Sequence, residues 1–119
     1  MINIDLVNGE LKYEKWIFSP KKKLDYFLNI FHSTEMELWT SNQDWRSYRL
    51  SISRYFIFIL YFQDESLKMI DIFPTVKDNE NEVSLLLEKL GGESTYSWGR
   101  IEFNNDIKAS SKSVLIKYY

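Results

Sequence analysis

The chain of 119 residues has no cysteine, one histidine, four glycines and two prolines. Without cysteine, disulfides, thiol nucleophiles and cysteine-ligated zinc sites are excluded. His32 alone cannot build a multi-histidine metal centre, and we interpret it as a residue near the C-terminal end of a helix. Phosphate loops, dinucleotide fingerprints and nucleophile-elbow motifs are also missing. We therefore predict a protein that is not an enzyme and binds no cofactor or metal.

A basic excess and long apolar runs are missing as well. The formal net charge is −2, whereas proteins that bind nucleic acid usually carry a basic excess, so we expect no nucleic-acid partner. The longest apolar run, residues 55–62, is too short to cross a membrane as a helix, and the N-terminus does not resemble a signal peptide. We expect a cytoplasmic protein that does not bind membranes.

Aromatic side chains are abundant, at 17% of the residues. A chain of this length and apolar content can bury one core without staples, which predicts a single domain over residues 1–119. Residues 2–6 and 11–18 alternate and flank the Asn8-Gly9 pair, a strong hairpin signal. Residues 55–62 are predicted to form a central strand that is buried on both faces. The other predicted strands are residues 36–40, 45–53, 67–73, 98–104 and 113–119, with a hairpin loop at 105–112.

Two segments have the spacing of amphipathic helices. The first begins at the Ser-Pro pair of residues 19–20, which suits an N-cap and a first helical position. The second begins at Asp78 or Asn79 and ends at the Gly-Gly pair of residues 91–92. The predicted fold class is α+β: a single-domain twisted antiparallel sheet, in the order ββ-α-ββββ-α-ββ, with two packed helices. The first helix is expected to bury one apolar stripe, formed by Leu24, Phe27, Leu28 and Phe31.

Charged residues are unevenly distributed. Residues 12–23 are mostly basic and residues 62–82 are mostly acidic. Such clusters are usually solvated faces, although an acidic face can also meet a basic partner.

Trp39 and Trp45 flank a polar loop, and tryptophans in such places either pack into the core or anchor a partner. Trp98 and Asp106 belong to the last hairpin, where we expect structural roles, or a partner contact if the loop is exposed. The candidate partner-binding residues are Glu35, Glu37, Trp39, Asp44, Trp45, Asp64, Glu65 and Asp106.

Three groups of residues suggest a family. They are Asn-Gly-Glu-Leu-Lys at residues 8–12 with Ser-Pro at 19–20, the Phe62-x-Asp64-x-x-Leu67 hairpin, and the segment from Trp98-Gly99-Arg100-Ile101 to Ile116-x-Tyr118. In this order they resemble small α+β immunity proteins of bacterial polymorphic-toxin and contact-dependent growth inhibition systems. The resemblance implies a non-catalytic cytoplasmic inhibitor. Such a protein binds a cognate toxin domain and blocks its active site or a functional surface. Many such toxins are nucleases. For the chain by itself we expect a monomer or a homodimer.

Two other functions remain open from the residues alone. The chain could be a structural, adaptor or secretion-accessory module that forms a homodimer by pairing the edge strands of its sheet. It could also be a small-ligand binder or an enzyme, because aromatic side chains often line pockets.

Overall fold

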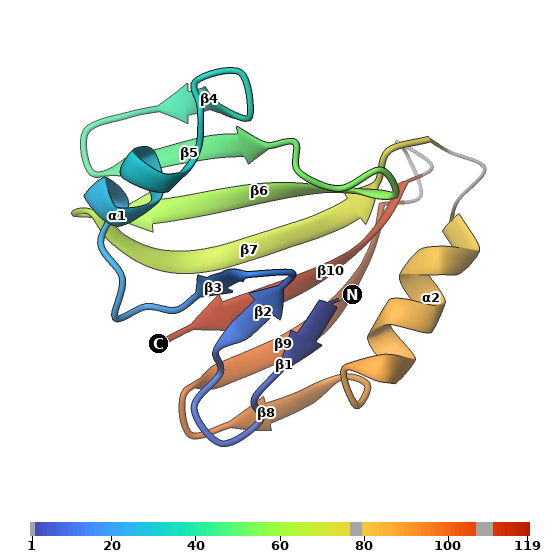
Figure 1. Ribbon diagram of the computed structural model, residues 1–119. Coiled ribbons are helices and arrows are strands. Elements are labelled where there is room, and N and C mark those ends of the chain that lie inside the picture. Colours follow the sequence, from blue (N-terminus) through green and yellow to red (C-terminus); the bar gives the residue numbers. More distant parts are fainter. Residues whose placement is uncertain (1, 77–79, 107–110) are drawn as a thin grey trace.

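The computed structural model describes residues 2–76, 80–106 and 111–119, except for the side chains of Glu80 and Asp106. A large antiparallel sheet forms one layer of the molecule, and two helices with a small sheet form a second layer on one of its faces (Figure 1). The helices are α1 (Leu24–Ile30) and α2 (Glu80–Lys89). The strands are β1 (Ile2–Ile4), β2 (Leu11–Tyr13), β3 (Trp16–Phe18), β4 (Met36–Ser41), β5 (Trp45–Leu50), β6 (Phe56–Gln63), β7 (Ser66–Pro74), β8 (Ser94–Tyr96), β9 (Gly99–Asp106) and β10 (Ser111–Tyr118).

The large sheet has the order β4-β5-β6-β7-β10-β9-β8, and the small sheet has the order β1-β2-β3. Each strand pairing is antiparallel. The last strand, β10, pairs with β7, the second strand of the central β6–β7 hairpin. This pairing joins the C-terminal strands β8, β9 and β10 to the rest of the large sheet. The predicted α+β class and its element order are confirmed, with two additional short strands.

One additional strand arises where residues 11–18 were predicted to form a single strand. The chain turns at Glu14, whose φ of 55° is left-handed, and β3 folds back against β2. The change in apolar phase within this segment marks the turn, and the single-strand prediction was wrong. The other additional strand is β8, whose three residues are too few for a recognisable alternation.

The first helix begins at Leu24, so the predicted start at residues 19–20 was wrong. The Ser19 hydroxyl accepts a hydrogen bond from the Lys21 N–H (3.2 Å), which closes a local turn instead. Lys23 then pairs with Ser66 in an isolated bridge, and the Leu24 N–H donates to the Glu65 carbonyl (2.9 Å). Tertiary contacts with the β6–β7 turn therefore decide where α1 starts.

The second helix ends as predicted. The Gly92 N–H donates to the Leu87 carbonyl (2.8 Å), and both glycines of the 91–92 pair have positive φ. The predicted cap at Asp78 or Asn79 lies outside the described residues. The last hairpin also differs from its prediction, because the β9–β10 ladder continues to the pair Asp106–Ser111. The predicted loop at 105–112 was therefore too long at both ends.

The core lies between the large sheet and the second layer. Phe18 of β3 stacks on Phe58 of β6 with ring centroids 6.0 Å apart, and Phe27 of α1 packs on Phe62 at 5.6 Å. Val83, Leu86 and Leu90 of α2 join the same buried cluster. Leu28 is exposed, so it does not belong to the buried stripe predicted for the first helix. Among the described helices, neither is long and apolar enough to cross a membrane.

Candidate partner-binding surface

One face of the large sheet points away from the core, and we call it the open face. Side chains alternate along β6, so Phe58, Leu60 and Phe62 point into the core while the intervening residues point outward. Ile57 and Ile59 are only 6% and 4% exposed, yet they do not belong to the core cluster. The strand is thus buried on both faces as predicted, although the helices and the small sheet pack on one side only (Figure 1). The other apolar side chains of the open face are Tyr61, Met69, Phe73 and Leu115.

Asp71 lies in the middle of the open face. Its Cα partners are Ile59 on β6 and Leu115 on β10, so apolar residues flank it on both neighbouring strands. Burial raises the pKa of the Asp71 carboxyl above its ordinary value, and a hydrogen bond with Ser113 offsets part of this rise. Oδ1 of Asp71 is buried and has no hydrogen-bond partner among the described residues. A buried carboxylate oxygen without a donor is uncommon in folded proteins, and its presence calls for a physical explanation.

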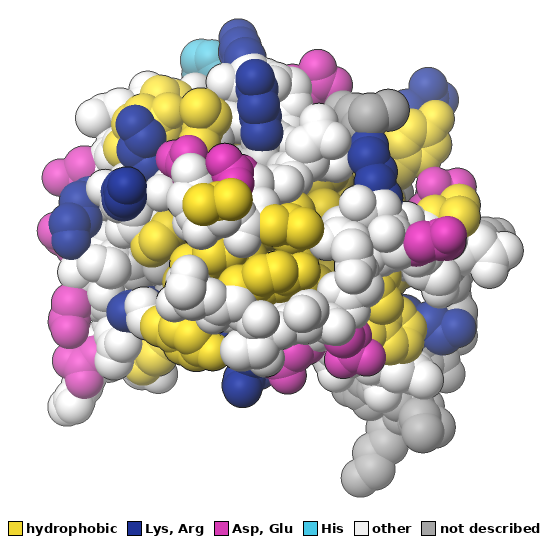
Figure 2. Space-filling view, turned by 90° about the horizontal axis from the view of Figure 1, so that it is seen from below, with side chains coloured by type: hydrophobic (Ala, Val, Ile, Leu, Met, Phe, Trp, Pro, Cys, Tyr) yellow, Lys and Arg dark blue, Asp and Glu magenta, His cyan; other side chains and the backbone are white. Residues whose placement is uncertain are grey.

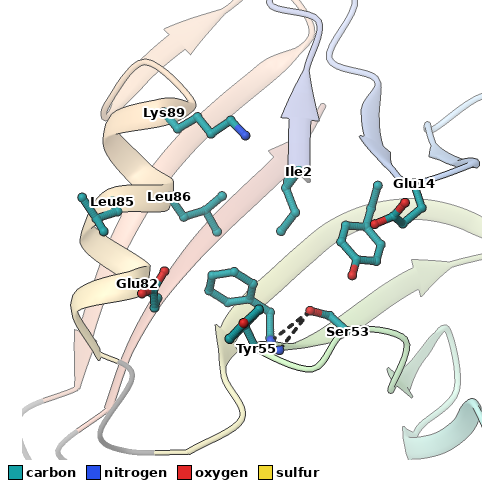
Figure 3. Close-up of a pocket in the computed structure, with 10 residues that line it drawn as sticks. Ile2, Glu14, Ser53, Tyr55, Glu82, Leu85, Leu86 and Lys89 are labelled. Atoms are coloured by element: carbon teal, nitrogen blue, oxygen red, sulfur yellow. Dashed lines mark hydrogen bonds between the residues drawn. The ribbon is translucent and has the colours of Figure 1, made fainter.

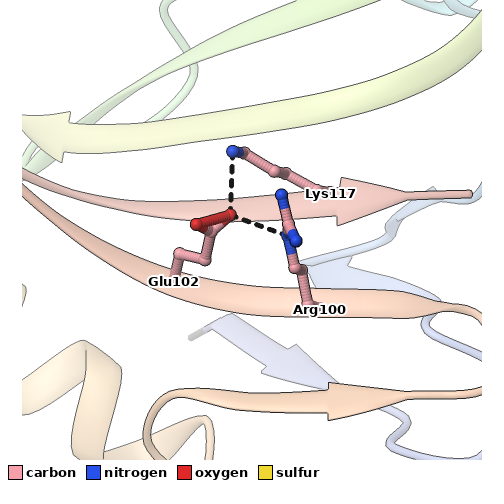
Figure 4. A network of polar contacts seen from close by, with 3 residues as sticks. All are labelled: Arg100, Glu102 and Lys117. Carbon is pink, nitrogen blue, oxygen red and sulfur yellow. Dashed lines mark ion pairs between the residues drawn. The ribbon is translucent and has the colours of Figure 1, made fainter.

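A second carboxylate on this face forms ion pairs within the chain. The Glu102 carboxylate contacts Lys117 Nζ at 2.8 Å and Arg100 Nε at 3.0 Å (Figure 4). The Lys117 hydrogen bond, together with the charges of both cations, lowers the pKa of Glu102. The two basic side chains at this end of the open face are therefore directed at a carboxylate of the same chain.

Two predicted anchors, Trp39 and Trp45, lie at the margin of the open face, so neither packs into the core. Trp39 sits in a bulge of β4 and is 55% exposed, and the Arg49 guanidinium stands over its ring at 5.5 Å. Trp45 is 38% exposed and borders an open groove of about 480 Å³ with Met69 and Lys117. Glu37, another candidate, faces solvent opposite Arg49 in the β4–β5 ladder.

The structure brings three of the predicted acidic residues together at the edge of the sheet where β5 begins and β6 ends. Asp44, Asp64 and Glu65 line a hollow of about 190 Å³ with Arg46, and we call these three residues the acidic corner. The Asp64 N–H donates to the Asp44 carbonyl (3.2 Å), which fixes the two turns against each other. Leu24 and the inward-facing Phe62 also line this hollow, so it opens on the helix side of the sheet, next to the edge at which Trp45 borders the groove.

Glu35 does not join this surface. Glu35 accepts a hydrogen bond from the His32 N–H (3.0 Å), which closes the turn after α1. His32 is exposed and lies two residues beyond the end of that helix. The Asp106 side chain lies outside the described residues. Trp98 has the structural role that was expected, since its indole N–H donates to the Leu6 carbonyl (2.9 Å).

Two further surfaces could contact other molecules. A groove of about 400 Å³ runs between α2 and the start of β6, and the exposed side chains of Tyr55 and Leu85 border it (Figure 3). Glu82 and Lys89 contribute opposite charges to its α2 side. The end of the molecule near β8 presents hydrophobic side chains with charges scattered around them (Figure 2). Within the part of the chain that the structure describes, no three acidic or histidine side chains cluster closely enough to hold a metal ion.

Sequence reasoning missed the open face. It identified the apolar run of residues 55–62 but could not say that one of the two faces of this strand has no covering layer. It also did not select Asp71, although a single acidic residue between Ile70 and Ile72 in a predicted strand was a usable signal.

Comparison with known proteins shows a shared fold. No protein-family model matches the sequence, and no curated protein matches it. A chain of the solved structure of Rhs1-CT in complex with its cognate immunity protein RhsI1 superimposes with a TM-score of 0.65. The superposition covers 99% of this chain and 87% of the other, at 13% sequence identity. At this identity the likeness concerns the fold rather than individual residues.

Proposed function

We propose that this chain is an immunity protein that binds a cognate toxin domain and neutralises it without catalysis. The observation that carries the proposal is the fold shared over 99% of the chain with a chain of a toxin–immunity complex. The resemblance of residues 8–12, 62–67 and 98–118 to immunity proteins of bacterial toxin systems points the same way. The chain would act in the cytoplasm of the cell that produces the toxin.

The surface described above supports inhibition by direct contact. Two exposed tryptophans, Trp39 and Trp45, border a sheet face on which the helices do not pack. Tryptophans often anchor interfaces, and acidic side chains give complementarity to a basic partner. We propose that the toxin is a nuclease with a basic cleft, and that the chain covers its active site or a functional surface.

Co-expression tests the proposal. The protein encoded immediately upstream of this chain's gene would be expressed in a sensitive bacterium with and without the chain. We expect growth arrest by that protein alone, rescue by the chain, and a 1:1 complex in light scattering of the purified mixture. An unrelated gene neighbourhood, or a toxic neighbour that the chain neither binds nor neutralises, would overturn the proposal. A mass for the chain alone that rises with concentration to that of a dimer would instead favour the adaptor module.

A further inference from the structure

We propose that the open face is the surface that binds the toxin, and that a lysine or arginine of the toxin, set within an apolar patch, pairs with Asp71. This inference rests on the proposed function and specifies the partner's chemistry at the centre of the interface.

The first argument is that the open face has the make-up of an interface core. Six of its side chains are apolar, and they come from three adjacent strands whose register places them side by side. The helices and the small sheet all pack on the opposite side. Interface cores are rich in aromatic residues and Met and poor in charge, and Tyr61, Met69 and Phe73 fit that pattern. The groove beside Trp45 and Met69 adds a hollow that a partner side chain can enter.

The second argument is that a carboxylate oxygen at the centre of the open face lacks a hydrogen-bond donor. Oδ1 of Asp71 is buried without a donor among the described residues, and the cross-strand neighbours Ile59 and Leu115 are apolar. Ser113 hydrogen-bonds to the carboxylate, and the charge of Asp71 raises the pKa of the nearby Tyr61, but neither side chain satisfies Oδ1. Burying a charged group without a partner is costly, and pairing it with a cation in an interface offsets part of that cost. A partner side chain that arrives over Asp71 satisfies the carboxylate only if it donates hydrogen bonds. A lysine or arginine also matches its charge.

The third argument concerns the charges around this centre. The cations of the open face and of its groove contact groups of the same chain. Arg49 stands over Trp39, Arg100 and Lys117 bind Glu102, and Lys68, which also lines the groove, donates to the Tyr119 carbonyl (3.4 Å). The acidic corner lies at the Trp45 edge of the sheet, and its hollow opens on the helix side, because Leu24 and the inward-facing Phe62 also line it. The charge that faces a partner at the centre of the open face is therefore that of Asp71, which is complementary to a basic side chain.

The groove beside α2 is the competing apolar surface. It exposes Tyr55 and Leu85, but its charges are mixed, and among the described residues that line it there is no counterpart of Asp71. The open face is favoured because it combines apolar area with a specific unmet polar group.

Two matched pairs of variants test the inference by calorimetric titration with the upstream-encoded toxin domain. Asp71→Asn keeps the shape and removes the charge, while Asp25→Asn makes the same change at an exposed position of α1. Met69→Arg places a charge on the open face, while Leu85→Arg places it in the competing groove. We expect Asp71→Asn and Met69→Arg to weaken binding by about 30-fold or more, the range for a desolvated charge pair or an obstructed interface core. The two control variants should bind within about twofold of wild type, the effect expected outside an interface core.

The outcomes separate the inference from the proposed function. If the wild-type chain does not bind the toxin, the proposed function fails and this inference fails with it. If wild type binds but Asp71→Asn and Met69→Arg bind equally well, the toxin uses another surface and only the inference is overturned. Loss of binding in Leu85→Arg with normal binding in Met69→Arg would place the interface beside α2. The free energy of unfolding of each unbound variant shows whether a variant fails to bind because it is unfolded. The inference requires that Asp71→Asn remains folded.

Discussion

Gly9 and the indole ring of Trp98 are in direct contact, so closely that a Cβ atom at position 9 would overlap the ring. The loop between β1 and β2 is therefore seated on the chain just before β9. Two hydrogen bonds hold it there: Trp98 Nε1–H donates to the Leu6 carbonyl at 2.9 Å, and the Tyr118 hydroxyl donates to the Gly9 carbonyl at 2.7 Å. These contacts join the first ten residues of the chain to the last strand.

Gly9→Ala is expected to destabilise the protein strongly. The substitution meets a left-handed φ of 78° and the Trp98 ring at once, for a loss of about 2–4 kcal/mol in the free energy of unfolding. Gly92→Ala is the control, because Gly92 has a φ of 79° and no atom within 4 Å of the added Cβ. It should lose only about 1 kcal/mol, the cost of the backbone conformation. Urea denaturation measures both, and equal losses would show that the Trp98 contact adds nothing.

Tyr118→Phe tests the hydrogen bond to the same loop. Tyr118 is buried, and its hydroxyl, which is protonated at neutral pH, donates to the Gly9 carbonyl. Burial raises the pKa of this hydroxyl further above its ordinary value. Removing it leaves the Gly9 carbonyl without this donor, and we expect a loss of about 1–2 kcal/mol in chemical denaturation. An unchanged midpoint would mean that water replaces the hydroxyl.

Leu86→Ala and Leu87→Ala are neighbouring truncations on α2 with different expected costs. Leu86 belongs to the buried core, whereas Leu87 is partly buried and packs at its edge. Leu86→Ala should lose about 2–5 kcal/mol through the cavity it leaves, and Leu87→Ala clearly less. Thermal or urea unfolding gives the comparison, and a larger loss for Leu87 would contradict the orientation of the helix.

Asp71→Asn is expected to stabilise the unbound protein at neutral pH. The folded-state pKa of Asp71 is raised by burial, so the folded protein holds this proton more tightly than the unfolded chain does. The Asp71 carboxyl group therefore contributes most favourably to the stability of the fold at pH values below its ordinary pKa of 3.8. This contribution becomes less favourable as the pH rises through the raised pKa of the folded state. The other charged groups of the open face, Arg49, Arg100, Glu102 and Lys117, are unchanged by the substitution.

The measurement is the difference in unfolding free energy between Asp71→Asn and wild type from pH 3 to pH 7. We expect this difference to grow with pH in favour of the variant and to reach about 1 kcal/mol, the scale of a buried polar group without a partner. A variant that is less stable than wild type at pH 7 would show that the carboxylate stabilises the fold.

The acidic corner gives a binding prediction of its own. Asp44→Lys should weaken toxin binding by about two- to fivefold, as expected for an exposed charge at the rim of an interface, without changing thermal stability. Asp44 suits charge reversal better than Asp64 or Glu65, whose positive φ values of 49° and 71° would add backbone strain to a lysine. The weakening should shrink as salt is added, because salt screens exposed charges. An unchanged affinity at low salt would remove the acidic corner from the interface.

Local sequence patterns by themselves determined most of the elements. The continuous apolar run of residues 55–62 located β6, and the helical spacing of Val83, Leu86, Leu87 and Leu90 located α2, although Leu87 is only partly buried. The glycine pair at 91–92 ended this helix. These predictions succeeded because the interactions that define them lie within a few residues. The pairing of antiparallel neighbours followed from the short connections.

The tertiary structure decided the rest. The start of α1 depends on a hydrogen bond from Leu24 to the carbonyl of Glu65, far along the chain, and no local pattern encodes it. The meeting of Asp44 with Asp64 and Glu65 likewise follows from the β5–β6 register. Alternation along a strand tells which residues share a face, but not whether another layer covers that face. Only the packing of both helices and the small sheet on one side left the open face, with Asp71 in its middle, without a covering layer.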